Sequence, residues 1–516
     1  MPSTGTRTSR LRNDREIAMA TNDLQTNRAR VAELVGRPWK MLIDGKMVEA
    51  RGGERYATLS PSTGTQLAEV PFARQFEIDS AVMAAEKAFP AWRDMPLTGR
   101  VAIVRQFIDV LKEHEHDLAL LDAANLGSPV TSMHGDVQLA CQLLEYICHA
   151  AFEVRGHTIP GTGNNWHLTR REPYGVVGRI IPFNHPLMFA ASKIGAPLVM
   201  GNTVVLKVPD QAPLAPLYMG ELIREVFPAG VINVISGDGR TAGDALVRHP
   251  RVKRIALTGS VETGQLIQRA AADVMIKHVS LELGGKNPMI VYPDADIDKA
   301  VEGAARGMNF HWSQGQSCGS TSRLFLHRDI HDEFVAKLKL RVERIRIGDP
   351  LDPETEMGCV VSKAQFDRVH KYIGLGKEQG AVCVTGGDRP DGAAFQKGYF
   401  IRPTIFVGVA ADFRIAQEEI FGPVLSVLKW EDEDTVIANA NAVSYGLTAA
   451  VWTRDINRAF KAISRLEAGF TWINGTSSHF AGVPFGGYKN SGIDSEEGIE
   501  ELYSYTQLKT VNVMIS

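Results

Sequence analysis

Short apolar runs recur between residues 175 and 291, and their spacing indicates the fold class. The runs are GVVGRII (175–181), TVVLK (203–207), VINVI (231–235), RIAL (254–257) and HVSLEL (278–283). Stretches of helical character separate them, for example 217–226. Strands that alternate with helices are typical of parallel βαβ units, so the pattern predicts a doubly wound sheet covered on both faces.

A second alternating region lies downstream and predicts a second domain of the same class. It begins with a helical stretch at 300–310 and continues with strands near 324–326, 381–385, 424–428, 449–452 and 470–474. Residues 151–171 and 504–513 alternate polar and apolar side chains, which indicates exposed strands. We therefore predict an α/β protein with two doubly wound parallel-sheet domains and a small β arm.

Composition narrows the class of protein and of partner. The chain has 516 residues, of which 44% are hydrophobic, more than one core normally supports. A formal net charge of −3 argues against a nucleic acid or an anionic membrane as partner. No apolar run approaches the roughly 20 residues of a membrane span. The five cysteines are odd in number and lack metal-type spacing, so neither a metal site nor a disulfide framework is expected.

The N-terminal residues 1–37 differ from the rest, being rich in Ser, Thr, Arg and Asn without a sustained apolar period. They predict an arm, either disordered or embracing another subunit, or a partly spurious extension upstream of Met19. A mitochondrial transit peptide is the alternative. Asp14, Glu16 and Asp23 count against it, because such peptides are poor in acids. We expect a cytoplasmic protein.

Two segments carry residues suited to acyl chemistry. Cys318 lies in the small, polar stretch GQSCGS (315–320), and Glu282 lies in LELGGK (281–286) at the end of a predicted strand. A lone cysteine is usually a small buried hydrophobe, and a strand-end glutamate is usually solvated or ion-paired. Together, however, they supply what two-step acyl transfer needs: a nucleophile that forms a thioester and a base that hydrolyses it.

Further segments occur in a fixed order around this pair. They are IIPFNHP (180–186), LK (206–207), TGS (258–260), QEEIFGPV (417–424) and PFGGYKNSG (484–492). With these segments the chain, from about Met41 to Val513, resembles the aldehyde dehydrogenase superfamily, in its non-acylating, hydrolytic type. The resemblance implies a dinucleotide-binding domain at 38–150 and 172–284 and a catalytic domain at 285–490. It also implies oligomerisation segments at 151–171 and 499–516, and a homodimer or homotetramer.

The catalytic roles implied by the resemblance fall on five residues. Cys318 attacks the aldehyde as a thiolate, whose pKa should be lowered by nearby N–H groups or by the nicotinamide charge. The Asn184 amide and the Cys318 N–H group stabilise the oxyanion. Glu282 then activates the water that hydrolyses the thioester. Lys193 and Glu496 match positions proposed as a proton relay behind that base.

The resemblance also implies a site for NAD. Gly259 and Ser260 precede a predicted helix, whose N-terminus favours phosphate. Lys207 and Asp210 match a pair that binds the adenosine ribose, and a carboxylate there should repel a 2′-phosphate, so NAD is preferred over NADP. The remaining candidates for the cofactor site are Ile181, Phe183, Gly239, Leu283, Gly284, Glu419 and Phe421.

Substrate choice depends on a set of positions that the resemblance places around the aldehyde, mostly aromatic or soft and without Lys or Arg. They are His185, Met188, His311, Trp312, His479 and Phe485. Such walls suit a small apolar or aromatic aldehyde, with or without a hydroxyl group, better than a carboxylate-bearing one. The alternatives are an NADP-preferring semialdehyde dehydrogenase and a non-catalytic binding protein on the same fold. A coenzyme A acylating enzyme is disfavoured by Glu282.

Overall fold

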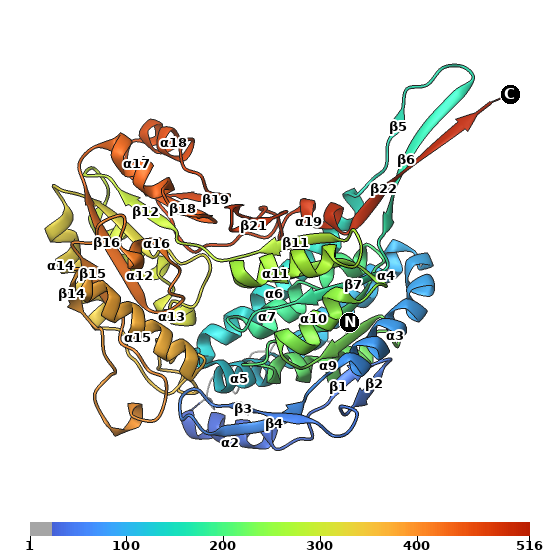
Figure 1. Ribbon diagram of the computed structural model, residues 1–516, viewed down its shortest axis with the longest axis horizontal. Helices are drawn as coiled ribbons and strands as arrows, with labels where there is room; N and C mark the ends of the chain where they lie inside the picture. The colour runs from blue at the N-terminus through green and yellow to red at the C-terminus, as the bar shows by residue number, and fades with distance from the viewer. Residues whose placement is uncertain (1–22, 516) are drawn as a thin grey trace, which may run out of the picture.

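The computed structural model describes residues 23–515, which form two α/β domains and a projecting arm (Figure 1). The blue and green half of the chain builds the first domain, and the yellow to orange half builds the second. This architecture confirms the predicted fold class of two domains with parallel sheets and small additional antiparallel strands.

The first domain is built on an eight-stranded sheet in the order β2-β1-β9-β8-β7-β10-β11-β21. Its five central strands are parallel, and β1, β2 and β21 are antiparallel additions at the edges. The strands are β1 (Met41–Ile43), β2 (Lys46–Val48), β7 (Val176–Ile180), β8 (Thr203–Lys207), β9 (Ile232–Ile235), β10 (Val252–Thr258), β11 (His278–Glu282) and β21 (Gly492–Ile493). All five strands predicted between 175 and 283 are therefore present in the central, parallel part.

Helices cover both faces of this sheet. Consecutive strand residues point to opposite faces, and Val204 and Val205 accordingly belong to two separate hydrophobic cores. The helices and helical turns of this domain are α3 (Gln75–Asp94), α4 (Leu97–Glu113), α5 (Glu115–Leu126), α6 (Val130–Ala150), η1 (Ala151–Glu153), α7 (Pro186–Ser192), α8 (Gly195–Val199), α9 (Leu214–Val226), η2 (Gly239–Gly243), α10 (Asp244–Arg248) and α11 (Val261–Ala272). A small sheet of β3 (Arg55–Leu59) and β4 (Gln66–Pro71) lies beside them.

The second domain contains a seven-stranded sheet in the order β14-β15-β16-β13-β12-β18-β19, parallel except for β14. Its strands are β12 (Pro288–Val291), β13 (Arg323–His327), β14 (Val382–Thr385), β15 (Thr404–Val407), β16 (Val424–Trp430), β18 (Thr448–Trp452) and β19 (Phe470–Ile473). The sequence analysis did not predict β12 and β15. Each lies beside a proline, Pro288 at the start of β12 and Pro403 directly before β15, and a proline indicates a turn or an edge strand rather than an inner strand.

Helices and short connections complete the second domain. They are α12 (Ile297–Gly307), α13 (Phe310–Ser313), α14 (His331–Glu343), α15 (Lys363–Glu378), η3 (Ala393–Phe395), α16 (Arg414–Gln417), α17 (Glu433–Asn441), α18 (Ile456–Ile463) and the paired β17 (Tyr445–Gly446) and β20 (Tyr488–Lys489). The turn that contains Cys318 connects α13 to β13, so the candidate nucleophile comes from this domain.

A three-stranded antiparallel arm projects from the body of the molecule (Figure 1). It consists of β5 (Thr158–Ile159), β6 (Asn165–Pro173) and β22 (Thr506–Met514). Strand β22 pairs with β6 along its whole length, from Thr506 opposite Pro173 to Met514 opposite Asn165. The segment assigned to the arm from residue 499 begins instead with helix α19 (Ile499–Ser504), which packs against α6 and α8 of the body.

The N-terminal segment differs from its prediction. Within it, α2 (Leu24–Val35) is a regular helix, capped by the Asp23 side chain, which accepts a hydrogen bond from Thr26 N at 2.7 Å. Val31 and Leu34 are buried on one face, so a short apolar period was present but was diluted by the polar residues before it. The rest of the predicted arm, residues 1–22, lies outside the described residues. Within 23–515, no helix is both long and apolar enough to cross a membrane.

Candidate active site

Polar residues gather where the central strands of the first sheet end. Lys207, Thr258 and Glu282 are the last residues of β8, β10 and β11, and Asn184 follows β7. These four strands are parallel, so their carboxyl ends meet at one edge. The nucleophile turn of the second domain faces the same edge, because Cys318 lines a cleft together with all four residues.

Two cavities meet at this point. One is a long cleft between the domains, and the other is a smaller cavity bounded by α6, α7 and α13. Four residues line both of them: Asn184, Thr258, Glu282 and Cys318. A molecule in either cavity can therefore reach the same thiol and the same carboxylate, and the thiol is not sealed in packed hydrocarbon.

The turn around Cys318 is held by unusual backbone geometry. Helix α13 is flanked by Asn309 and Gln314, both non-glycine residues in the left-handed region, with φ of 55° and 54°. Asn287 holds the turn in place, because its Nδ2 donates to the Cys318 carbonyl oxygen at 2.7 Å and to that of Ser320 at 2.9 Å. Such preorganisation suits a residue whose position matters for chemistry.

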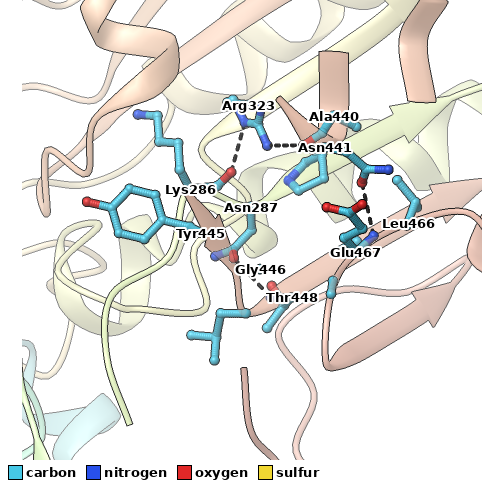
Figure 2. Close-up of a pocket in the computed structure, with 14 residues that line it drawn as sticks. Lys286, Asn287, Arg323, Ala440, Asn441, Tyr445, Gly446, Thr448, Leu466 and Glu467 are labelled. Carbon is cyan, nitrogen blue, oxygen red and sulfur yellow. Dashed lines mark hydrogen bonds between the residues drawn. The ribbon is translucent and has the colours of Figure 1, made fainter. Parts of the chain in front are cut away.

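A separate pocket, lined by Asn287 and its neighbours, contains the hydrogen bonds that hold Asn287 in place (Figure 2). The buried Arg323 donates from Nε to the Lys286 carbonyl oxygen at 2.8 Å and from Nη2 to that of Ala440 at 2.7 Å. The Thr448 N–H group donates to Asn287 Oδ1 at 3.0 Å. These bonds join the segment that crosses between the domains to β13, α17 and β18, so Asn287 is rigidly held.

The pKa of the Cys318 thiol is raised, whereas the sequence analysis predicted that it would be lowered. Burial, followed by the carboxylates of Glu419 and Glu282, raises its pKa to about 12, although the N–H groups of Gly319 and Cys318 act in the opposite direction. The predicted lowering therefore does not hold in the protein alone. The backbone donors are present, but burial and two carboxyl groups outweigh them.

Glu282 is a buried carboxyl group without a partner. The residue is 6% exposed, and neither Oε1 nor Oε2 receives a hydrogen bond from the described part of the chain. Burial, and secondly the charge of Glu496, raise its pKa well above the ordinary value of a glutamate. A buried, unpaired carboxyl group that lines both cavities can take a proton from a small molecule between them.

Behind Glu282 lies a second carboxylate whose charge is fully compensated. Glu496 accepts from Arg179 Nη1 at 2.6 Å and from Lys193 Nζ at 2.9 Å. Burial opposes ionisation, but the two cations outweigh it and lower the pKa of Glu496 to about 2. Because no described residue bonds to the oxygens of Glu282, the predicted relay is not a continuous chain of direct hydrogen bonds.

All eleven residues predicted to hold the cofactor line the long cleft. They are Ile181, Phe183, Lys207, Asp210, Gly239, Gly259, Ser260, Leu283, Gly284, Glu419 and Phe421. Ser260 is the N-cap of α11, and the N-terminus of this twelve-residue helix opens into the cleft. Lys207 is 4% exposed, and burial lowers its pKa, an effect partly offset by Asp210 and Asp238. The donor set fits a dinucleotide, with N–H groups for phosphate and a Lys–Asp pair for ribose hydroxyls.

Glu419 holds the segment that connects the two domains, at the edge of this cleft. Its Oε1 accepts from the Gly285 N–H group at 2.9 Å, and burial raises the pKa of its carboxyl group to about 7. The neighbouring Gly284 allows the close approach, because a Cβ atom at that position would lie 2.2 Å from Glu419 Oε2. A larger residue at 284 would therefore force this carboxylate to move.

Five of the six residues predicted for the substrate site line the smaller cavity: His185, Met188, Trp312, His479 and Phe485. His311 is the exception, because it does not line this cavity. Adjacent residues of a helix point about 100° apart, so when Trp312 faces the cavity His311 does not. The His311 ring instead has Nε2 at 3.3 Å from Arg341 Nη2.

The sequence analysis missed several contributors to the site, among them Thr258, Glu497 and Asp136. Thr258 lines both cavities, Glu497 lines the smaller one, and Asp136 is buried behind its wall. Asp136 had a detectable signal, because an acid at an apolar position of α6, between Met133 and Val137, is rarely buried without a partner. Within residues 23–515 no cluster of His, Cys, Asp or Glu could hold a metal ion.

Comparison with known proteins agrees with this geometry. The model of the aldehyde dehydrogenase family matches residues 47–511. The aldehyde dehydrogenase tropH of Talaromyces stipitatus is 45% identical over 92% of this chain and 93% of its own length. The mitochondrial benzaldehyde dehydrogenase of Antirrhinum majus is 43% identical over 92% of this chain and 88% of its own.

Solved structures have the same fold. The NAD⁺ complex of aldehyde dehydrogenase from Bacillus cereus superposes with a TM-score of 0.91 at 41% identity, covering 94% of this chain and 99% of that one. A likeness at this identity and coverage extends to both domains and to the connections between them.

Proposed function

Because the chain belongs to the aldehyde dehydrogenase family, and is an oxidoreductase that uses NAD, we propose that it oxidises an apolar or aromatic aldehyde to the free carboxylic acid. The reaction passes through a thioester on Cys318. The single observation that carries the proposal is that Cys318, Glu282 and Asn184 line both the cleft and the smaller cavity.

The first step forms a carbon–sulfur bond. The Cys318 thiol gives its proton to the carboxylate of Glu282, which lines the same two cavities and passes the proton on before the second step. The thiolate attacks the aldehyde carbon, and the carbonyl oxygen becomes an oxyanion that the Asn184 amide and the Cys318 N–H group stabilise. NAD, when bound in the cleft, supplies the acceptor for the hydride that leaves this carbon. Loss of the hydride restores the carbon–oxygen double bond, so a thioester remains on Cys318.

The second step breaks the carbon–sulfur bond. Glu282 takes a proton from water, whose oxygen attacks the thioester carbon, and the sulfur leaves as thiolate. The unpaired state of Glu282 supports this role, because a carboxylate already bound to a cation would be a weaker base. The compensated Glu496 and Lys193 lie behind it and are proposed to pass the proton onward.

The wall of the smaller cavity supports the proposed substrate class. The only cation among its residues, Lys193, is bound to Glu496 at 2.9 Å, so the described wall offers no free partner to a substrate carboxylate. This disfavours a semialdehyde acid. Asp210, beside Lys207 in the cleft, disfavours the additional phosphate of NADP. A cytoplasmic location is likewise a proposal.

The arm supports a proposal about assembly. Trp166 and Leu508 are more than half exposed on β6 and β22, and Val511 and Val513 are also exposed. An antiparallel arm with exposed apolar side chains and free edges is suited to pairing with another copy of the chain. We propose a homodimer or homotetramer, and light scattering of the full chain would measure its mass.

The test of the proposed reaction is the stoichiometric formation of NADH and benzoate from NAD and benzaldehyde. Cys318→Ala should abolish turnover. Cys383→Ala is the matched control: Cys383 is also a free, partly accessible cysteine, but its thiol donates to the Thr385 carbonyl oxygen away from both cavities. Full activity of Cys318→Ala would refute the assignment. A coenzyme A thioester, formed when coenzyme A is added, would identify an acylating enzyme instead.

A further inference from the structure

A buried carboxylate stands behind the wall of the smaller cavity without lining it. Asp136, on α6, is completely buried. Its Oδ2 lies 2.8 Å from His185 Nδ1, and its Oδ1 accepts from Trp312 Nε1 at 2.6 Å. The His185 and Trp312 rings meet edge to face, with centroids 5.0 Å apart. One acid therefore positions two neighbouring side chains of the cavity wall.

The contacts of Asp136 determine which nitrogen of His185 carries the proton. The indole Nε1 of Trp312 can only donate, so Asp136 accepts that bond through Oδ1. When Asp136 is a carboxylate, its Oδ2 can also only accept, and His185 Nδ1 is then the donor of the second bond. In the neutral imidazole the lone pair is then on Nε2, at the far side of the ring from Asp136.

Nε2 of His185 has no partner among residues 23–515, and His185 lines the cavity. A second imidazole, His479, is held similarly by Glu497, with Nδ1 and Oε2 3.0 Å apart. Its side chain is 21% exposed, whereas that of His185 is 6% exposed, so water competes more strongly at His479. His185 is therefore the position where a substrate hydroxyl gains most over water.

We propose that the Asp136–His185–Trp312 triad selects aromatic aldehydes that carry a hydroxyl group on the ring, which donates a hydrogen bond to His185 Nε2. The proposal rests on the proposed function. A site that accepts a hydroxyl proton discriminates against an analogue without it, because the buried acceptor then stays unpaired. Asp136 acts as a positioning residue, since it does not line the cavity.

The experiment compares kcat/KM for 3- and 4-hydroxybenzaldehyde, the corresponding methoxybenzaldehydes and benzaldehyde. The methoxy compounds retain the oxygen but have no proton to donate. We expect one hydroxy isomer to exceed both benzaldehyde and its methoxy analogue about tenfold or more, the effect of one additional hydrogen bond. His185→Phe should reduce this ratio to near one.

Asp136→Asn tests the positioning role. An amide offers only one acceptor to two N–H donors, so His185 no longer has a reason to keep its proton on Nδ1, and the hydroxyl preference should fall. The readout is the ratio of kcat/KM values, which a general loss of stability would not change. The matched control is His134→Phe on the same helix, where an imidazole lies 2.9 Å from Glu115 outside both cavities. It should leave the ratio unchanged.

The outcomes separate this inference from the proposed function. Oxidation of benzaldehyde with no preference for either hydroxy isomer would overturn the triad while leaving the reaction intact. A preference that survives in His185→Phe would overturn it as well. If no aldehyde yields NADH, the proposed function fails and the triad fails with it.

Discussion

Two buried carboxylates of the same site stand in opposite electrostatic states. Glu282, at the end of β11, has no partner, and burial raises its pKa. Glu496, next to β21, is bound by Arg179 and Lys193, and these cations lower its pKa to about 2. Burial alone therefore does not determine the charge state of a carboxyl group. The unpaired acid can itself take a proton from water, whereas the paired one is held as a carboxylate by two cations.

The largest expected effect comes from removing the unpaired acid. Glu282→Gln should slow NADH turnover about 10²- to 10⁴-fold, the usual contribution of a general base, and should let the acyl thioester accumulate. Intact mass measurement during turnover would detect the adduct on Cys318. Rapid turnover without an adduct would place the base elsewhere.

The same substitution should leave stability unchanged or improve it. A group whose pKa is raised by folding adds stability only below its unfolded pKa and loses it as the pH rises through the folded pKa. At neutral pH the carboxyl group of Glu282 therefore destabilises the folded state, and the neutral amide of glutamine removes this destabilisation. Chemical denaturation at pH 7 would show this, and a large loss of stability would contradict the unpaired state.

Removing the paired acid should lower the stability of the protein, in contrast to the removal of Glu282. Glu496→Gln leaves Arg179 and Lys193 buried without their carboxylate, which costs about 3–5 kcal/mol of unfolding free energy. Urea denaturation measures this loss. An unchanged midpoint would mean that the pair contributes nothing net.

The two acids are also coupled, because the charge of Glu496 helps to raise the pKa of Glu282. Since Glu282 acts as a base in its ionised form, the rate of thioester hydrolysis should fall as the pH decreases through its raised pKa. In Glu496→Gln the repelling charge is absent, so this fall should move to lower pH. Single-turnover hydrolysis rates across pH measure the shift. A shift to higher pH would contradict the coupling.

The smallest effect is expected for an ion pair at the surface. Lys363 and Asp367 lie 2.6 Å apart on α15, but their side chains are 67% and 56% exposed. Lys363→Ala should change the unfolding free energy by no more than about 0.5 kcal/mol, because solvent screens the pair. This variant is the reference for Glu496→Gln in the same denaturation experiment, and equal losses in both would refute the contrast.

The sequence allowed much of this site to be predicted because strand ends are local features. Glu282 and Lys207 each close a run of apolar residues, and parallel strands bring such ends together whatever the intervening loops are. The Cys318 turn was visible as a small polar segment. The contrast between Glu282 and Glu496 was not, because it depends on Arg179 and Lys193, which reach Glu496 from other parts of the chain.

Other features needed coordinates for similar reasons. The raised pKa of Cys318 results from depth and from Glu419, which lies 101 positions further along the chain (419 − 318). The exclusion of His311 from the cavity depends on the rotation of α13, which sequence spacing alone does not define. The link between Asp136 and His185 joins α6 to the start of α7, two helices whose mutual packing no local pattern predicts.

The arm has a consequence for the biogenesis of the chain. Every pair in its longer ladder joins β6 to the last described strand, for example Thr506 to Pro173. Contacts so distant along the chain require closure of a very large loop, which slows their formation. Until β22 has been synthesised, β6 can pair only with β5, on its other side. The strands of both main sheets precede β22 in the chain, so they can pair before this ladder forms.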